Sequence, residues 1–314
     1  METTTTLTAR GNAYSIIAAF TASADIRQTT RQTYTRLLSA FIEWIYTSGR
    51  NVGDITAADI VAYKTHLLAT KSTSTASLSI VAIRRFFTWV EEQGGNNVAR
   101  KVRTPKVART FKRQHLTASE ARALVAAAKN KRDKAIITLM LTTGLREVEV
   151  TRLNIADITT RHIVTEDGEE VTRRCLKVWG KGHNEADTII VMPLAAWNAI
   201  HEYLDTRYVV TDSEPLFVGS GNRHIGGRLS TKTIRVIVKA ALRAIGLDGK
   251  EYSTHSLRHT AAVAALKNGS DITAVQAMLR HSSSNTTQIY IESIKEELRL
   301  THAAEDNAAA YLSL

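Results

Sequence analysis

Residues 254–269 read THSLRHTAAVAALKNG and combine an alanine-rich helix with a basic first turn. His255 and Arg258 lie three residues apart and would project from one face, whereas His259 is rotated by about 100° from Arg258 and would serve packing or phosphate contact. A buried cation is unfavourable unless it is paired, and the positive end of a helix makes it less favourable still. The segment therefore predicts a bound anion. Whether the site holds or cleaves that anion depends on the rest of the chain.

Length and composition indicate a protein of two domains. The 314 residues exceed the usual size of one domain, and 44% of them are hydrophobic. No apolar run approaches the roughly 18 residues of a membrane span, and the first residues, METTTTLTAR, lack the profile of a secretory signal. The single cysteine, Cys175, excludes an intramolecular disulfide and is expected to pack in a strand. A single cysteine also fits a reducing environment, so we expect a cytoplasmic protein. No cysteines and histidines cluster at zinc spacing, so we expect no metal site.

The positive charge is concentrated in the first third of the chain. The net charge is +11; residues 1–115 hold 16 Lys and Arg against 7 Asp and Glu, whereas residues 116–314 hold 25 against 23. Seven basic residues and no acidic one fall between positions 100 and 113: Arg100, Lys101, Arg103, Lys106, Arg109, Lys112 and Arg113. This segment is either a solvated linker or a tether along a polyphosphate, since Lys and Arg displace counterions from DNA. Charge alone does not separate DNA from RNA or an acidic membrane.

Residues 1–99 are predicted to form a helical domain of four or five helices. Apolar residues follow helical spacing within 34–45, 60–68 and 80–90. Gly49 would close the first of these segments, and Gly94 would close the last. Thr56 and Asp59 have the spacing of a capping box that opens the second segment. We expect the aromatic residues of these helices to lie in the core, and residues 100–115 to form the basic linker.

Residues 116–314 are predicted to form a second, mixed domain. Thr117 and Glu120 suit another capping box, and helical periodicity continues to Gly144. Residues 161–192 change character, because β-branched runs flank two turns, Asp167-Gly168 and GKGHNE at 180–185. That pattern predicts a small three-stranded antiparallel sheet, after which the helical pattern returns from Pro193. The chain is therefore expected to be mainly α, with a helical domain followed by an α+β domain.

A basic stripe is predicted on a helix within residues 230–246. Ser230 is a plausible N-cap and Gly246 a plausible end. The side expected to face the core carries Ile234, Ile237, Ala241 and Ile245, and another side carries Lys232, Arg235, Lys239 and Arg243. A cationic stripe on a core-anchored helix suits a DNA groove and its phosphates, although a solvated face has the same composition.

Further chemistry-bearing residues accompany His255 and Arg258. Arg146 follows a glycine that ends an apolar helix, and Glu149 could hold it in position. Lys181 lies at the tip of an expected hairpin, between glycines. His281 follows another helix end, and Tyr290 comes nine residues after it. Each of these residues alone is more often structural than functional, so their joint order and spacing carry the prediction.

The ordered set Arg, Lys, His-x-x-Arg, His, Tyr resembles the tyrosine recombinases, the phage integrase family, from about Gln28 to the C-terminus. The matching segments are TTGLREVEVTRL, VWGKGH, THSLRHTAAVAAL and MLRHSSSNTTQIYI. The resemblance implies a SAM-like core-binding domain in residues 1–99, a basic linker in 100–115 and a catalytic domain in 116–314. It implies a site-specific recombinase of the two-domain Xer- or Cre-like type, which works on DNA without a metal or nucleotide cofactor.

The resemblance also implies the residue roles. Tyr290 would attack a DNA phosphodiester and become linked to the 3′-phosphate. Arg146 and Arg258 would bind the non-bridging oxygens, and Lys181 would protonate the leaving 5′-oxygen.

The remaining catalytic roles fall to two histidines. His255 would help to remove the tyrosine proton, and His281 would donate a hydrogen bond to the phosphate. Glu149 and His259 would be supporting residues. Two alternatives share this composition: a type IB topoisomerase-like relaxing enzyme, and a DNA-binding regulator with a vestigial site.

Two departures from the family pattern stand out. Arg280 occupies the place before the second histidine where members commonly have glycine, so a helix end of positive φ would be mildly strained and Arg280 could contact DNA instead. The hairpin after Lys181 carries Glu185 and Asp187 in place of basic residues.

Assembly is expected to follow the family. The short segment before the helical module leaves no room for an arm-binding domain, and 24 residues follow Tyr290, ending in AAAYLSL. The resemblance implies a tetramer on DNA sites with inverted repeats, with this tail docked on the neighbouring subunit. The alternative is a tail that folds on its own domain or stays disordered. Chromosome dimer resolution, phage or transposon integration and plasmid maintenance stay open.

Overall fold

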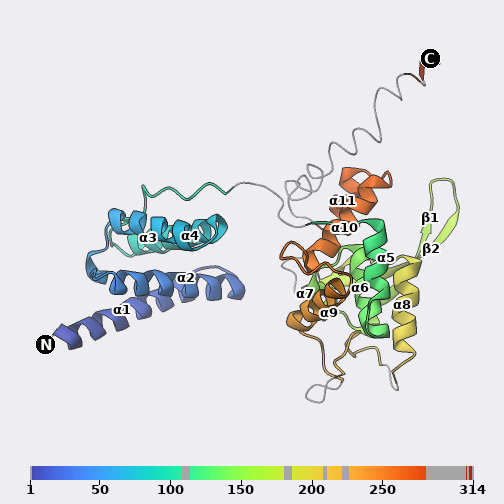
Figure 1. Cartoon of the computed structure of the whole chain (residues 1–314), viewed down its shortest axis with the longest axis horizontal. Coiled ribbons are helices and arrows are strands. Elements are labelled where there is room, and N and C mark those ends of the chain that lie inside the picture. Colours follow the sequence, from blue (N-terminus) through green and yellow to red (C-terminus); the bar gives the residue numbers. More distant parts are fainter. Residues whose placement is uncertain are drawn as a thin grey trace. The chain divides into compact units, whose positions relative to one another are not determined.

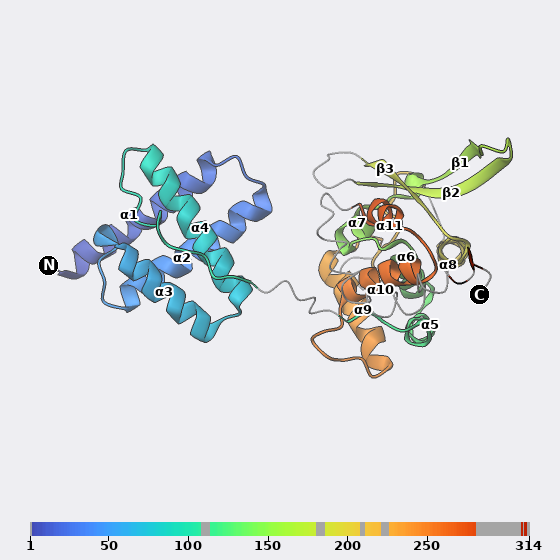
Figure 2. The ribbon, with the colours of Figure 1, turned by 90° about the horizontal axis from the view of Figure 1, so that it is seen from above.

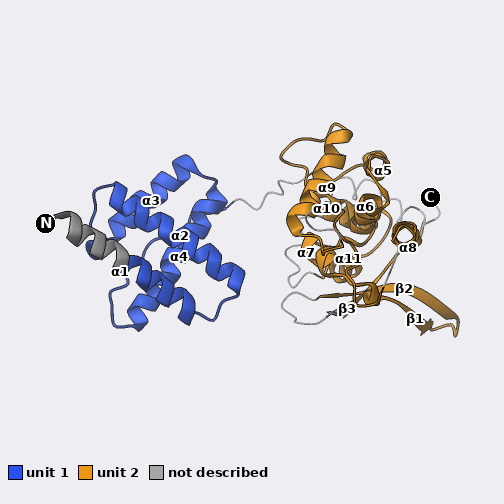
Figure 3. Ribbon diagram, turned by 90° about the horizontal axis from the view of Figure 1, so that it is seen from below, with its two compact units in different colours: residues 1–109 blue, residues 110–314 orange. Residues whose placement is uncertain are grey.

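The computed structural model divides the chain into two compact units, unit 1 of residues 1–109 and unit 2 of residues 110–314 (Figure 3). The structure describes residues 2–107, 114–179, 186–207, 211–220 and 226–280, together with residues 309, 311 and 312. For residues 2–11, 186 and 187 it describes the backbone alone. Each unit has its own hydrophobic core.

Unit 1 consists of four α-helices and a short 3-10 turn within its described residues. They are α1 (Glu2–Ser23), α2 (Gln28–Thr47), the turn Val52–Asp54, α3 (Ala57–Thr70) and α4 (Thr73–Glu92) (Figure 1). The predicted capping box opens α3, since the Thr56 hydroxyl accepts from the Asp59 N–H and the Asp59 carboxylate accepts from the Thr56 N–H. Gly49 and Gly94, which follow α2 and α4, both have positive φ.

The aromatic residues of unit 1 are core residues, as expected. Phe20 of α1 contacts the rings of Phe86 and Trp89 of α4. Tyr63 of α3 packs against Phe41 of α2 at 5.0 Å between ring centroids. These contacts join α1 to α4 and α3 to α2.

The described part of unit 2 holds seven α-helices and a small sheet. The helices are α5 (Ala118–Ala126), α6 (Lys131–Thr143), α7 (Glu147–Arg152), α8 (Leu194–Leu204), α9 (Thr231–Ala244), α10 (Thr254–Lys267) and α11 (Ile272–Leu279). The helical pattern from Thr117 to Gly144 is thus carried by two helices, because the Asn130 side chain accepts from the Asp133 N–H and starts α6. The predicted capping box of Thr117 and Glu120 opens α5.

The predicted three-stranded antiparallel sheet is confirmed. Its strands are β1 (Ile158–Val164), β2 (Glu170–Trp179) and β3 (Ala186–Val191), in the order β1-β2-β3. Gly168, at φ +82, lies in the predicted turn between β1 and β2, which form a twisted hairpin at the edge of unit 2 (Figure 2). Cys175 of β2 is buried opposite Val191 of β3. The second predicted turn, 180–185, lies outside the described residues.

The centre of unit 2 is α6, with α10 packed alongside it (Figure 2). Ile136, Ile137, Leu139 and Met140 of α6 are all fully buried. A helix that is apolar around most of its circumference must be covered on all sides, so α6 organises the elements around it. The packing around α6 therefore also fixes the position of its C-terminal end, at Gly144. Of the helices that the structure describes, none has the length and apolar character needed to cross a membrane.

Candidate functional site

The first part of the site is the tight connection between α6 and α7. Gly144 ends α6 with a left-handed φ of +63. Arg146 is the N-cap of α7, and its N–H donates to the Glu149 carboxylate at 2.7 Å. The Arg146 side chain also turns back to Glu149, with 2.8 Å between Nη1 and Oε1. Glu149 thus holds both the backbone and the guanidinium of Arg146, as the sequence predicted it could.

Arg258 reaches this connection from the first turns of α10. Its side chain is buried, and its guanidinium donates to the carbonyl oxygens of Gly144 and Leu279. Those oxygens belong to the ends of α6 and α11, where helical carbonyls lack partners within their own helix. The Arg258 guanidinium therefore joins α10 to the C-terminal ends of α6 and α11. The end of α6, at Gly144, lies two residues before Arg146.

Gly144 is required for this approach by its surroundings as well as by its φ. A Cβ added at Gly144 would lie 2.5 Å from Leu279 Cδ2 and 3.7 Å from Arg258 Cγ. The sequence singled out the glycine as a helix end, and the structure adds that α10 and α11 pack directly on it.

Glu149 is shared by two arginines. Its Oε2 accepts from Arg280 Nη2 at 2.8 Å, in addition to the contacts of Arg146. The carboxylate side chain is only 6% exposed. Burial by itself raises the pKa of the Glu149 carboxyl, but the charges of Arg280 and Arg146 and the Arg146 N–H hold that pKa below its ordinary value. Glu149 is therefore a buried anion between two cations.

Arg280 adopts the left-handed conformation that the sequence suggested for this helix end. Its φ of 53° and ψ of 47° place it in the region that glycine occupies without strain. Its side chain is 9% exposed and faces Glu149. The DNA contact expected for Arg280 stays a prediction.

The two histidines on α10 have different surroundings. His255 is exposed on the first turn. His259 is buried, and its ring lies edge-on to the ring of His115 at 5.2 Å between centroids. The geometry favours the packing role for His259.

The predicted basic stripe lies on α9, with much of its charge already paired. Arg235 donates to both carboxylate oxygens of Glu147, at 2.8 and 2.9 Å from its Nε. Lys239 and Arg243 both contact Asp248, while Lys232 is exposed. Ile234, Ile237 and Ala241 are buried, as the predicted core side requires, and Ser230 caps the helix.

Glu147 is a site neighbour that the sequence reasoning missed. It directly follows Arg146, and besides Arg235 it accepts a hydrogen bond from the Thr254 hydroxyl at the start of α10. Its partners lie 88 and 107 residues away in sequence, so no local spacing indicates them. The only sequence signal is its place beside Arg146.

Other predicted residues are exposed or lie outside the described residues. Arg100 forms an ion pair with Glu91, and Lys101, Arg103 and Lys106 are exposed. The predicted residues outside the described ranges are Arg109, Lys112, Arg113, Lys181, His281 and Tyr290. Their roles stay predictions.

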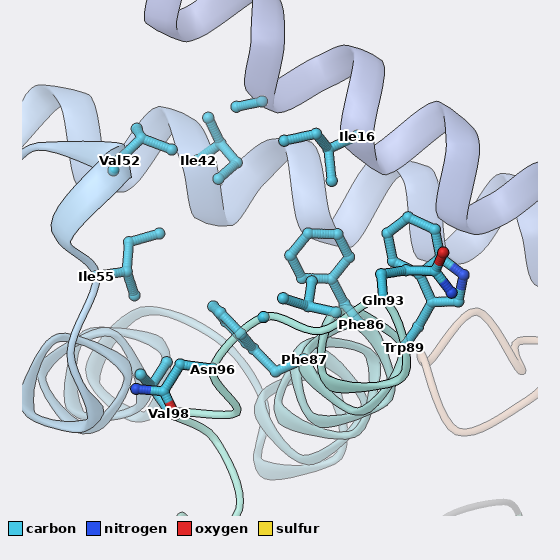
Figure 4. A pocket seen from close by; sticks show the side chains of 14 residues that line it. Ile16, Ile42, Val52, Ile55, Phe86, Phe87, Trp89, Gln93, Asn96 and Val98 are labelled. Atoms are coloured by element: carbon cyan, nitrogen blue, oxygen red, sulfur yellow. The ribbon is translucent and has the colours of Figure 1, made fainter.

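An apolar pocket of about 620 Å³ in unit 1 offers a different kind of site (Figure 4). Its lining includes Ile16, Ile42, Phe86, Phe87 and Trp89, and no lining residue is charged. Such a pocket lacks the charged groups that phosphate chemistry requires. The candidate site is therefore the one formed in unit 2 by Arg146, Arg258 and Glu149.

Both units resemble known protein families. The model of the phage integrase family matches residues 114–297, and that of the phage integrase N-terminal SAM-like domain matches residues 16–94. The tyrosine recombinase XerC of Corynebacterium efficiens is 35% identical over 229 residues, which cover 70% of this chain and 67% of the relative.

A second relative matches along nearly its whole length. The tyrosine recombinase XerD of Lacticaseibacillus casei is 30% identical over 296 residues, which cover 88% of this chain and 93% of the relative. Among solved structures, a post-cleavage complex of the XerH site-specific recombinase with DNA has a similar fold, with a TM-score of 0.69 and 19% identity over 88% of this chain and 80% of that one. The predicted resemblance and fold class are thereby confirmed, and this chain belongs to the phage integrase family.

Proposed function

We propose that the chain is a site-specific DNA recombinase that cuts and rejoins DNA through a covalent 3′-phosphotyrosine intermediate. The observation that carries the proposal is the convergence of Arg146 and Arg258 on one turn at Gly144. Two guanidiniums held at fixed helix ends can bind the non-bridging oxygens of one phosphodiester in bidentate fashion. They would stabilise the charge that develops on those oxygens in the transition state, without a metal or nucleotide cofactor.

The reaction needs three further groups. The Tyr290 hydroxyl would attack phosphorus and lose its proton to His255, while the bond from phosphorus to the 5′-oxygen breaks. Lys181 would protonate that leaving oxygen, and His281 would donate a hydrogen bond to the phosphate. Attack of a 5′-hydroxyl on the phosphotyrosine reverses the sequence and rejoins a strand, so the energy of the phosphodiester is conserved.

The exposure of His255 supports this role. His255 is exposed one helical turn before the buried Arg258, so a proton acceptor and a phosphate ligand would lie on one face of α10. Glu149 would orient Arg146, and His259 would support α10 from the core.

We further propose that the active form is a homotetramer on two DNA sites with inverted repeats, assembled by exchange of the C-terminal tail. The basic residues of positions 100–113 and of α9 would contact the phosphates. The protein would act in the cytoplasm, at the nucleoid, in integration of a mobile element or in a related recombination. Removal of residues 304–314 is expected to abolish the tetramer in sedimentation on DNA while leaving binding of single sites.

The chemistry is tested with DNA that the chain itself selects from a randomised duplex library. A nick placed beside the cleavage position lets the cut fragment diffuse away and traps the covalent adduct. The wild-type chain is expected to form the adduct, and Tyr290→Phe is expected to bind the same duplex without forming it.

The other outcomes separate the alternatives. An adduct in Tyr290→Phe would show that another residue is the nucleophile. Relaxation of two-site plasmids without recombination would favour a topoisomerase-like enzyme. Tight binding with no adduct in the wild type would favour a DNA-binding regulator.

A further inference from the structure

Arg280 is the single non-glycine residue with positive φ among those that the structure describes. In this conformation the Cβ of an L-residue crowds the neighbouring carbonyl oxygen, whereas glycine meets no such contact. An arginine in this conformation therefore strains the end of α11. A strain of this kind persists only where surrounding contacts hold the residue in place.

The contacts that hold Arg280 come from inside unit 2. Its Nη2 donates to Glu149 Oε2 at 2.8 Å, across 131 residues of sequence, and its Nη1 donates to the Met278 carbonyl oxygen at 2.8 Å. Its side chain is far less exposed than that of Arg146, which is 29% exposed. Arg280 thus faces α7 from the protein side, and Arg146 is the more accessible partner of Glu149.

Sharing changes the charge that Arg146 presents. A carboxylate paired with one guanidinium forms a neutral pair, whereas one carboxylate between two guanidiniums leaves one positive charge over. Glu149 Oε2 accepts from the Arg280 side chain and the Arg146 N–H, whereas Oε1 accepts from the Arg146 side chain. Among the residues that the structure describes, Arg146 and Arg280 are the charged groups that act on Glu149.

We propose that Arg280 is a positioning residue for DNA cleavage: by binding Glu149 it fixes that carboxylate against α7 and leaves the Arg146 guanidinium with positive charge for the scissile phosphate. In this proposal Arg280 acts on the phosphate through Glu149, and a direct contact of Arg280 with DNA is the alternative that the test separates from it. The inference rests on the proposed recombinase function and adds to it a residue at a position where the family commonly has glycine.

The test compares Arg280→Gly and Arg280→Lys with the wild type on the library-selected duplex. Arg280→Gly suits the left-handed backbone, so it removes the charge without adding strain. Its adduct is expected to form about tenfold or more slowly at saturating DNA, because Arg146 is then neutralised by Glu149. Its dissociation constant for the duplex is expected to stay within about twofold, with an unchanged salt dependence. Arg280→Lys keeps the charge and is expected to recover a large part of the rate.

Two comparisons make the test specific. Arg122→Ala removes a positive charge from an exposed position on α5 and is expected to change neither rate nor affinity. In a Glu149→Gln background, Arg280→Gly is expected to have little further effect, because the group through which Arg280 acts is already gone.

Several results would overturn the proposal. A wild-type rate in Arg280→Gly would show that Arg280 does not assist cleavage. Weaker binding with a reduced salt dependence and an unchanged saturated rate would make Arg280 a DNA contact. If Arg280→Gly does not fold, a folded Arg280→Lys as slow as an Arg280→Ala variant decides against a role for the charge. Absence of an adduct in the wild type would instead contradict the proposed function itself, and this inference with it.

Discussion

The guanidinium of Arg258 donates to the carbonyl oxygen of Gly144, 114 residues earlier in the chain. The same guanidinium donates to Leu279, so the ends of α6 and α11 meet at the start of α10. Arg146 begins α7 two residues after Gly144. The geometry of the candidate site therefore depends on how closely three helices approach one glycine.

Gly144→Ala is expected to destabilise unit 2 by about 1–3 kcal/mol, because a non-glycine residue at positive φ is strained and the new Cβ would meet the fully buried Leu279. Hydrogen exchange of α6 and α10 amides measures the loss. Gly168→Ala is the matched control, since Gly168 also has positive φ but its Cβ would meet nothing within 4 Å. Equal losses in the two variants would show that the Leu279 contact is unimportant.

Arg258→Lys is expected to fold and to cleave about 10²–10³-fold more slowly. A lysine ammonium is compact and cannot span two carbonyl oxygens while presenting a planar fork to a phosphate. Single-turnover adduct formation on the selected duplex measures the rate, and Arg122→Lys on the surface of α5 serves as the control. A rate near that of the wild type would remove Arg258 from the proposed mechanism.

Glu149 makes the stability of unit 2 depend on pH. Because its pKa in the folded chain is held below its ordinary value, its contribution is present above that ordinary value and is lost as the pH falls through the folded pKa. Glu149→Gln is expected to lower stability by about 3 kcal/mol near pH 7, since it leaves two guanidiniums near each other without their anion. Hydrogen exchange of α7 amides is expected to show this difference shrinking as the pH falls below the ordinary pKa of a glutamate, 4.5. A difference that does not change with pH would contradict this account.

Lys181→Ala is expected to abolish cleavage of a normal substrate and to recover it when the leaving 5′-oxygen is replaced by sulfur. A thiolate leaves without protonation, so it does not need a general acid. Adduct yield on the two substrates is the measurement, and Tyr290→Phe, which should be inactive on both, is the control. Failure of the sulfur substrate to rescue Lys181→Ala would argue against the acid role.

The α9 residues are expected to differ in their effect on DNA binding. Lys232→Ala is expected to reduce the salt dependence of affinity by about one counterion, as a phosphate contact does, with little change in stability. Arg235→Ala is expected also to destabilise unit 2, because it leaves the largely buried Glu147 without its guanidinium partner. Binding titrations at several salt concentrations and hydrogen exchange separate the two effects. Identical behaviour of the two variants would mean that the Glu147 pair has no structural importance.

Features that a few neighbouring residues control could be predicted before the fold was known. The capping boxes at Thr56 and Thr117, the glycine end of α6 and the turn at Gly168 were all predicted and are present. They could be predicted because hydrogen bonds within three or four residues, and the steric freedom of glycine, do not depend on the rest of the fold. The order of the Arg, Lys, His and Tyr residues also identified the family, because that order is read from the sequence without coordinates.

Which charges neutralise one another depends on how the helices pack, and could not be predicted. Arg280 was expected at most to contact DNA, and its bond to Glu149 appears only when α7 and α11 pack together across 131 residues. Arg235 was part of a stripe in sequence, and in the structure it is paired with Glu147. A charged side chain finds its partner through the packing of the hydrophobic core, which brings distant segments within a few ångströms. That packing is a property of the whole domain, and local sequence patterns do not encode it.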